Sequence, residues 1–256
     1  MSVVVGAIST FSDRAIVQQT LLAIARVHQT IQLCLFTKTW SFANSPSSGL
    51  KDITFPISMA DTPHETGYYF AQQFTFTGVF DVGHIGLQPR PDASGSSIVH
   101  AVFSSFVSGT TSTDPNCHDG ADGGADVSCA VEIPAPYAPL YDLVVQNSAG
   151  TTWTATLVDT ASGKSTHVGS YTLPSEAGGI ESSQVGFVEY YPWNGMQSHM
   201  CSSLPYTNVT FVAPTSSTPG AGWGQVHRPY EYGDCVGKVN FNAQTTGHGY
   251  QVSVGF

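Results

Sequence analysis

Residues 67–76, GYYFAQQFTF, decide the fold class, because their side chains alternate in a way that suits an extended strand. The expected strand places Phe70, Gln72, Phe74 and Phe76 on one face and Tyr69, Ala71, Gln73 and Thr75 on the other. An amphipathic helix would instead repeat its apolar positions every three or four residues. The stretch therefore predicts a β-strand at this point of the chain.

Short segments of the same kind follow along the rest of the chain. They are HIGLQP, SIVHAVFSSFV, YDLVVQN, TTWTATLVDT, THVGSYTL, SQVGFVEYY, NVTFV, GKVNFNA and YQVSVGF. About ten short strands separated by turns rich in Gly, Asn and Pro predict an all-β protein, an antiparallel β-sandwich or jelly roll. We expect Trp153 and Phe187 in the core between its two sheets.

The N-terminal segment, residues 1–37, differs from residues 38–256, which are expected to form a single β-sandwich domain. Apolar residues between 14 and 36 recur at helical spacing, as Val17, Leu21 and Ile24 show. Two interpretations stay open for this segment: a genuine amphipathic helix, or a non-native start joined to the domain by an incorrect gene boundary. No stretch reaches the roughly 18 uninterrupted apolar residues of a membrane span.

The charge balance excludes two classes of partner. The 256 residues include 8 Lys and Arg against 18 Asp and Glu, a formal net charge of −10. A nucleic-acid-binding protein would need basic patches, and an anionic membrane surface would repel such a chain. Charged residues make up only 10% of the chain while 41% are hydrophobic, which suffices for a packed interior and is typical of secreted β proteins.

The chain has five cysteines, an odd number. The simplest pairing joins Cys117 to Cys129 and Cys201 to Cys235, and leaves Cys34 free, although spacing alone does not establish connectivity. Disulfides persist in oxidising compartments, so these pairings predict a secreted, extracellular protein.

Several of these segments together resemble a known family. GYYFAQQFTF, GHIGLQP, HAVFSSF, YDLVV, TTWTATLVDTASGKSTHVG and SSQVGFVEYYPWN are similar to a family of uncharacterised secreted β-sandwich domains of bacteria and fungi, sometimes found beside carbohydrate-active modules. The resemblance covers residues 64–256. It implies a jelly-roll fold, export and a role with polysaccharide, and it transfers no catalytic motif.

Residues 114–129, DPNCHDGADGGADVSC, form an acidic and glycine-rich loop. Ca²⁺ takes roughly six to eight oxygen ligands in flexible geometry, which carboxylates and loop carbonyls provide. The candidate calcium ligands are Asp114, Asn116, Asp119, Asp122 and Asp126. The alternative is a surface loop with solvated aspartates, closed by a Cys117–Cys129 bridge that would contribute about 3 kcal/mol.

Residues 186–201, GFVEYYPWNGMQSHMC, combine a carboxylate with a run of aromatic side chains. Period-two alternation places Glu189 on the same face as Phe187, where a carboxylate needs a partner or a groove. Aromatic rings stack on sugar rings while their polar tips reach hydroxyl groups. The predicted ligand groove comprises Gln88, Arg90, Glu189, Tyr190, Tyr191 and Trp193. The alternative is that the aromatics pack at the edge of the sandwich and Glu189 bonds local backbone.

These observations favour a secreted carbohydrate-binding protein that recognises a polysaccharide or other glycan through this groove. Two alternatives stay open: a polysaccharide lyase or glycoside hydrolase on the same fold, and a non-catalytic secreted protein that acts on another protein. The sequence does not decide whether the protein is an enzyme, because catalytic groups from distant strands show no local spacing.

Overall fold

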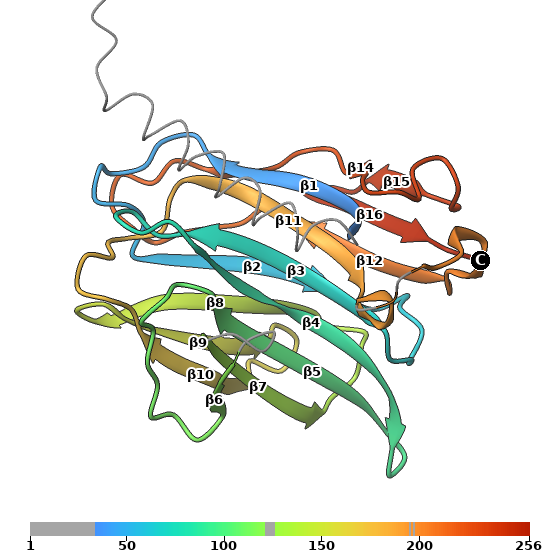
Figure 1. The fold of residues 1–256 in the computed structure, drawn as a ribbon, viewed down its shortest axis with the longest axis horizontal. Helices are drawn as coiled ribbons and strands as arrows, with labels where there is room; N and C mark the ends of the chain where they lie inside the picture. The colour runs from blue at the N-terminus through green and yellow to red at the C-terminus, as the bar shows by residue number, and fades with distance from the viewer. Residues whose placement is uncertain (1–33, 121–125, 195, 197) are drawn as a thin grey trace, which may run out of the picture. The chain divides into compact units, whose positions relative to one another are not determined.

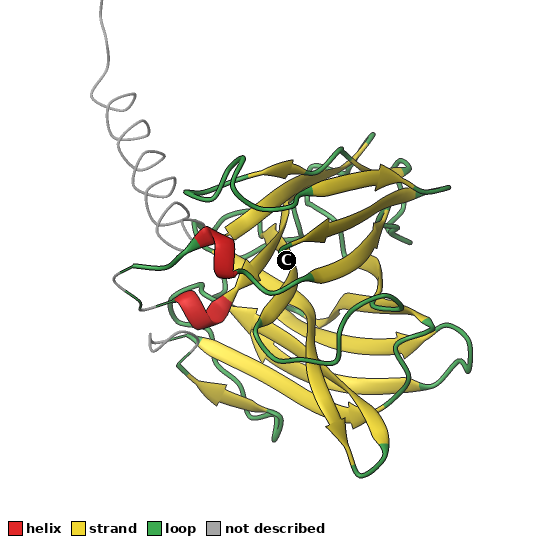
Figure 2. Cartoon of the chain, turned by 90° about the vertical axis from the view of Figure 1, so that its right-hand side faces the viewer, coloured by secondary structure: helices red, strands yellow, loops and turns green. Residues whose placement is uncertain are grey.

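The computed structural model describes residues 34–120, 126–194, 196 and 198–256. Strands make up nearly all of the regular structure of these residues, and they lie in two antiparallel sheets (Figures 1 and 2), which confirms the predicted β-sandwich. Residues 1–33, which hold most of the expected N-terminal helix, lie outside the described residues. The first strand begins at Cys34, so residues 34–37 belong to the sandwich and not to the N-terminal segment.

The first sheet has nine strands and the second has seven. The strands of the nine-stranded sheet are β1 (Cys34–Phe42), β3 (Tyr68–Thr75), β4 (Val82–Ala93), β5 (Ser96–Ser105), β6 (Cys117–Asp119), β7 (Val127–Pro134), β11 (Ser183–Tyr190), β13 (Gly224–Val226) and β14 (Tyr230–Glu231). The strands of the seven-stranded sheet are β2 (Asp52–Ser58), β8 (Leu140–Ala149), β9 (Thr152–Asp159), β10 (Ser165–Thr172), β12 (Thr207–Val212), β15 (Asn242–Thr245) and β16 (Gly249–Val254). Two short 3₁₀ helices, η2 (Tyr191–Trp193) and η3 (Cys201–Ser203), follow β11.

Strands that are distant in sequence lie side by side in both sheets. The nine-stranded sheet runs β13-β1-β11-β3-β4-β5-β7-β6, with β14 also paired to β1, and the other runs β10-β9-β8-β2-β12-β16-β15. The central strand β11 therefore pairs with β1 on one side and β3 on the other. This arrangement decides which polar side chains meet on the surface of the sheet.

The core fills the space between the two sheets. On β3, Phe70 and Phe74 are completely buried in it, together with Phe76, as the alternation of residues 67–76 predicts. Aromatic pairs connect the layers: Trp153 of β9 packs on Phe76 with ring centroids 5.0 Å apart. Trp153 is thus in the core, as predicted. Burying one such side chain contributes about 2–3 kcal/mol.

One polar pair is buried inside this core. Lys38 of β1 donates a hydrogen bond from Nζ to Gln72 Oε1 at 2.7 Å, and Nζ lies 4.1 Å from the ring centroid of Phe211. Burial holds the pKa of Lys38 well below its usual range. The neighbouring Gly186 makes room for the pair, because a Cβ there would lie 2.3 Å from Gln72 Oε1 and 2.5 Å from Lys38 Nζ.

Both predicted disulfides are present. Cys117 of β6 is bonded to Cys129, its direct cross-strand partner on β7. Cys201 at the start of η3 is bonded to Cys235. Within the described ranges, no helix has the length and apolar character needed to cross a membrane.

Candidate functional site

A row of polar side chains crosses the nine-stranded sheet on one of its faces. The pairing register places Glu189 of β11 opposite Tyr69 of β3. Phe70 of β3 pairs with Leu87 of β4. Because these strands are antiparallel, the next residue of β4, Gln88, lies beside Tyr69. Gln88 pairs with His100 of β5, and His100 pairs with Glu132 of β7. Side chains of paired residues point to the same side of a sheet, so these five share one face.

We call this face, which turns away from the seven-stranded sheet, the outer face of the nine-stranded sheet. The assignment follows from β3, where Phe70 and Phe74 belong to the core and the alternate residues Tyr69 and Gln73 therefore point the other way. The row from Glu189 to Glu132 spans five neighbouring strands, about 19 Å at the usual strand spacing. It is long enough to contact an extended polymer.

Glu189 is held in place by the segment that follows its own strand. Asn194, directly after η2, donates a hydrogen bond from Nδ2 to Glu189 Oε1 at 2.7 Å. Only 8% of Glu189 is exposed, so the carboxylate is placed rigidly and is not a mobile surface group. The alternative interpretation had Glu189 bonded to local backbone. The partner is indeed local, but it is a side chain.

Arg90 connects the middle of the row to its far end. Arg90 Nη2 donates a hydrogen bond to Gln88 Oε1 at 2.8 Å, and Arg90 Nε donates one to Glu132 Oε1 at 2.9 Å. The same carboxylate oxygen lies 3.1 Å from Nδ1 of His100. The hydrogen bond from Arg90 is the main cause that lowers the pKa of Glu132. Burial, and then the nearby Arg90 charge, lower the pKa of His100, which favours the neutral imidazole beside the ion pair of Arg90 and Glu132.

A buried cluster around Phe187 adjoins the row on the same face. The ring of Phe187 packs edge-on against Tyr69, with centroids 6.1 Å apart, and lies 5.1 Å from His84. His84 Nε2 also lies 3.0 Å from Gln73 Oε1. Burial lowers the pKa of His84 to about 3, so the imidazole stays neutral at physiological pH. The expectation that Phe187 lies between the sheets is wrong, since its strand presents it to the outer face opposite Ala71.

The predicted aromatic residues of the groove are only partly where the sequence analysis placed them. Tyr191 is at the site: its hydroxyl accepts a hydrogen bond from the Gly67 backbone at 3.0 Å and lies 3.4 Å from an Arg90 nitrogen. Trp193 is only 5% exposed and belongs to the core, where Tyr190 packs edge-on against it at 5.3 Å. Trp193 is therefore a structural anchor, and the expectation that it stacks on a ligand is wrong.

Tyr69, His100, Glu132 and Asn194 are site residues that the sequence analysis missed. His100 and Glu132 lie on the two strands that follow the IGLQPR strand in the sheet, β5 and β7, and period-two alternation within each strand gives the face on which they lie. Tyr69 had none beyond its place in the alternation of β3. Asn194 lies outside any strand, so no periodicity applies to it.

Among the described residues, Asp114, Asp119 and Asp126 do not form a group of three carboxylates close enough together to hold one ion. Asp114 has a side chain only 6% exposed, and its carboxylate accepts hydrogen bonds from His167 at 2.5 Å, Ser170 at 3.0 Å and the Asn116 backbone at 2.9 Å. These bonds are the causes that lower the pKa of Asp114 despite its desolvation. The carboxylates of Asp119 and Asp126 form no cluster with it.

Asp122 lies outside the described residues. The Asn116 side chain is also engaged, since its Nδ2 donates to the His167 carbonyl at 3.3 Å. Calcium binding by this loop therefore stays a prediction, with Asp114 already committed to other partners.

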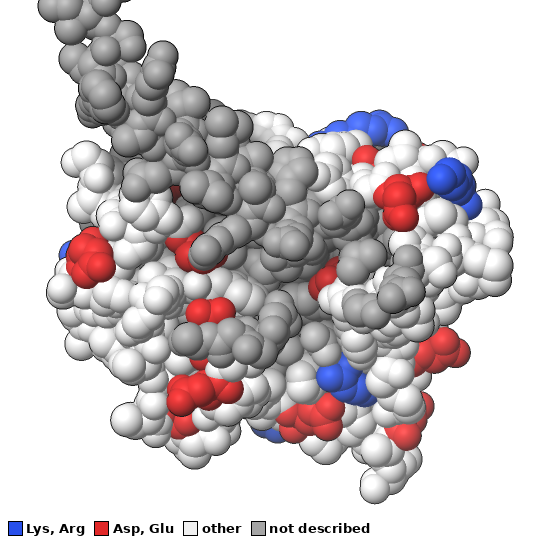
Figure 3. All heavy atoms as spheres, viewed as in Figure 1, with Lys and Arg blue, Asp and Glu red and all other residues white. Residues whose placement is uncertain are grey.

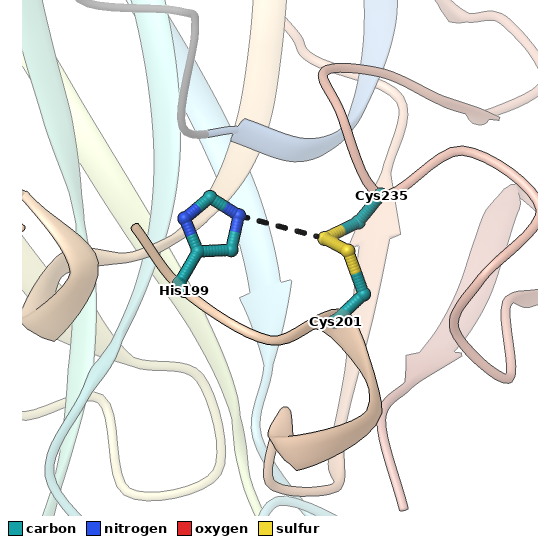
Figure 4. Close-up of side chains that lie close together, drawn as sticks. All are labelled: His199, Cys201 and Cys235. Carbon is teal, nitrogen blue, oxygen red and sulfur yellow. Dashed lines mark hydrogen bonds between the residues drawn. A yellow bond between two sulfur atoms is a disulfide. The ribbon is translucent and has the colours of Figure 1, made fainter. Parts of the chain in front are cut away.

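The described residues contain a single group with the ligand types of a metal site. The ligand atoms of His199, Cys201 and Cys235 all lie within 4.8 Å of one another (Figure 4). The two cysteines are bonded to each other, and His199 Nε2 lies 3.7 Å from Cys235 Sγ. His199 also stacks on Trp193, with ring centroids 4.1 Å apart.

The surface charge agrees with the composition. On the face of the molecule drawn in Figure 3, acidic side chains are more frequent than basic ones.

No family model matches the chain, and no curated protein matches it significantly. Among solved structures, scytalido-glutamic peptidase with a transition-state analogue inhibitor has 12% identity and a TM-score of 0.44, and the match covers 86% of this chain and 99% of that one. SCP-B, a peptidase of the eqolisin family solved with the tripeptide Ala-Ile-His, has 13% identity and a TM-score of 0.40 over the same shares.

A third similar structure is the CBM2 module of the evolved Dit protein of Lactobacillus casei BL23 phage J-1. It has 13% identity and a TM-score of 0.28, and the match covers 59% of this chain and 68% of that one. All three likenesses are too remote to indicate what this chain does.

Proposed function

We propose that this protein is an exported polysaccharide-binding protein, and that its ligand lies across the outer face of the nine-stranded sheet. The observation that supports this best is the row of Glu189, Tyr69, Gln88, His100 and Glu132, which places hydrogen-bond donors and acceptors in one line, with the ring of Tyr69 largely buried beneath them. A sugar polymer offers hydroxyl groups at regular intervals, so it suits such a surface. The two disulfides agree with export to an oxidising compartment.

Arg90 gives the proposed site a preference among polysaccharides. Its guanidinium sits beside Gln88 and Tyr191 and is already paired with Glu132, so it is a fixed donor at the middle of the row. A guanidinium can bind a carboxylate in bidentate fashion, so a uronate that replaces Glu132 or Gln88 as an acceptor of Arg90 would give the site a preference for uronate-containing polymers. The negative net charge opposes such a polymer at long range, so we expect the preference to grow as salt screens that repulsion.

Titration calorimetry with soluble pectin, alginate and a neutral glucan tests this proposal. Glu189→Gln and Gln88→Leu should each weaken binding at least fivefold at an unchanged melting temperature. Glu176→Gln is the matched control, because Glu176 is exposed and its carboxylate accepts a hydrogen bond from the hydroxyl of the neighbouring Ser175. Binding of none of these polymers, or equal binding by Glu189→Gln and the control, would place the function elsewhere.

A second candidate function is hydrolysis, with Glu189 as the general acid and base. The observation that favours it is the fixed, largely buried Glu189 carboxylate, which shares its row with the carboxamide of Gln88 two strands away. Cα atoms at this spacing are about 10 Å apart, so both side chains reach a bond held above Tyr69. A carboxylate there would remove a proton from the attacking water and return it to the leaving group, while the Gln88 amide donates to the developing oxyanion.

The geometry of the row indicates which bonds such an enzyme would cleave. Glycoside hydrolysis uses two carboxyl groups roughly 5–10 Å apart, but Glu132, the other carboxylate of the row, lies about 19 Å from Glu189 across the sheet. An amide or ester needs one carboxyl group and one oxyanion donor, so peptide bonds are the better substrate.

Casein cleavage measured between pH 3 and pH 8, beside reducing-end release from the same polysaccharides, separates the two candidate functions. Cleavage lost in Glu189→Gln supports the hydrolase, and polysaccharide binding without turnover supports the binding protein.

A further inference from the structure

We propose that the Cys201–Cys235 disulfide conceals a zinc site: once this disulfide is reduced, Cys201, Cys235 and His199 bind a Zn²⁺ ion. The three ligand atoms already lie within 4.8 Å of one another (Figure 4). The two cysteine Cα atoms are 5.5 Å apart. Rotation about the Cα–Cβ bonds therefore lets both sulfur atoms reach one ion at about 2.3 Å, with the imidazole nitrogen at about 2.0 Å.

The fourth ligand is available from the residue before Cys235. The carboxylate of Asp234 lies 3.2 Å from His199 Nε2, the nitrogen that faces the sulfur atoms. Two thiolates, one imidazole and one carboxylate make a four-coordinate set of the kind that Zn²⁺ prefers. The carboxylate side chain is exposed, so it can turn toward the ion at little cost.

The imidazole is held in place before any metal arrives. His199 stacks on Trp193 with an interplanar angle of 19°, and Trp193 is buried in the core. The side chain of His199 is itself only 8% exposed. Little side-chain entropy remains to be lost when this ligand binds, which favours affinity.

The second disulfide of the chain has no such surroundings. Cys117 and Cys129 lack a third ligand atom of His, Asp or Glu within the same distance, in the part of the chain that the structure describes. Gly169 packs directly on this bridge, since a Cβ there would lie 2.4 Å from Cys129 Cβ. Cys117–Cys129 is therefore an internal control for thiols that are reduced but have no histidine.

Reduction by a thiol such as glutathione opens the site in two successive thiol–disulfide exchanges. A thiolate attacks the sulfur of Cys201, the more exposed of the two, and the S–S bond breaks with its electron pair on the sulfur of Cys235 beside His199. A second thiol attacks the mixed disulfide, which releases the Cys201 thiolate and a disulfide of the reductant. Zn²⁺ then binds both thiolates, and the two thiol protons pass to the solvent.

Zinc stoichiometry of the full chain in the Cys34→Ser background tests the proposal. The chain is reduced with a phosphine, the reductant is removed under nitrogen, and metal is measured after desalting from a small excess of Zn²⁺. We expect one zinc per reduced chain and none per oxidised chain. With Co²⁺ in place of zinc, thiolate-to-cobalt charge-transfer bands should appear in the near ultraviolet.

Variants separate this site from other thiols. His199→Ala should lower zinc affinity at least tenfold, whereas His167→Ala, an exposed histidine of β10, should leave it unchanged. Reduced Cys201→Ser/Cys235→Ser should bind no zinc through its remaining cysteines. Zinc bound by that double variant, no zinc in the reduced chain, or equal affinity in His199→Ala would each overturn the proposal.

The proposal can also be tested if the chain unfolds when its disulfides are reduced. If the reduced chain loses its β-sheet circular dichroism, Zn²⁺ should restore the signal in the parent and not in His199→Ala, because the ion stabilises only the state that assembles its ligands. Failure of zinc to restore the parent would count against the site.

Discussion

Asn194 and Glu189 are joined by a hydrogen bond of 2.7 Å that fixes the carboxylate at one end of the polar row. The donor follows directly on Trp193, whose indole is buried in the core. A buried aromatic anchor thus sets the position of a polar side chain at the surface. The candidate site depends on the segment after β11 as much as on the sheet itself.

Removing this hydrogen bond should weaken ligand binding without unfolding the protein. Asn194→Ala is expected to lower polysaccharide affinity at least tenfold, since one hydrogen bond to a charged group contributes about 1.5–3 kcal/mol. Titration calorimetry measures the effect, and Asn242→Ala on the exposed strand β15 is the matched control. Unchanged affinity in Asn194→Ala would show that the orientation of Glu189 does not matter for binding.

Trp193 should act on stability and not directly on the ligand. Trp193→Ala removes a core side chain and is expected to lower the free energy of unfolding by about 3–5 kcal/mol. Trp223, which is 70% exposed, supplies the comparison, because Trp223→Ala should change stability by less than about 0.5 kcal/mol. Urea unfolding of both variants gives the numbers, and similar values for the two would contradict the placement of Trp193.

His84 should make the protein less stable in acid. Its pKa is about 3 in the folded state against 6.5 for an ordinary histidine, so between these pH values the unfolded chain binds a proton that the folded chain does not. The free energy of unfolding therefore falls as the pH drops below 6.5, by about 2 kcal/mol at pH 5. Urea unfolding at pH 7 and pH 5 should show a smaller acid loss in His84→Gln than in the parent. Equal losses would mean that other groups cause the acid sensitivity.

Lys38 should produce a pH dependence at the alkaline end. Its folded pKa lies well below 10.5, so between the lowered value and the ordinary one only the unfolded chain binds the proton. Stability is thus expected to rise with pH between neutral and about pH 10. Lys38→Met should remove this rise, as followed by urea unfolding at pH 7 and pH 9.5. Gln72→Leu, which leaves the buried amine without its acceptor, should cost about 2 kcal/mol at pH 7.

The sequence predicted the architecture well because alternation is a local property. The two faces of β3 were assigned correctly from residues 67–76, and the two disulfides from the simplest pairing. The same alternation failed for β11, where Phe187 was expected in the core. Both faces of this strand carry buried apolar side chains, so the pattern identifies two faces without telling which one turns inward.

The site was less predictable, because it depends on register between strands that are far apart in sequence. Glu189 and Gln88 were both expected in the groove, but their alignment through Tyr69 follows from the pairing of β11 with β3 and of β3 with β4. The buried position of Trp193 was not predictable for a different reason. An aromatic residue beside a Pro has the same local signature whether it anchors a turn in the core or stacks on a ligand.

The place of β1 in the nine-stranded sheet has a consequence for how the chain reaches its native state. Thr37 on this strand donates its hydroxyl hydrogen to the carbonyl of Gly186, 149 residues further along the chain. On the ribosome, β1 emerges long before β11, so it spends much of synthesis without its neighbour. Contacts of such high sequence separation slow folding and leave an unpaired strand open to aggregation in the meantime. The nascent chain is therefore expected to depend on chaperones until its C-terminal third has been made.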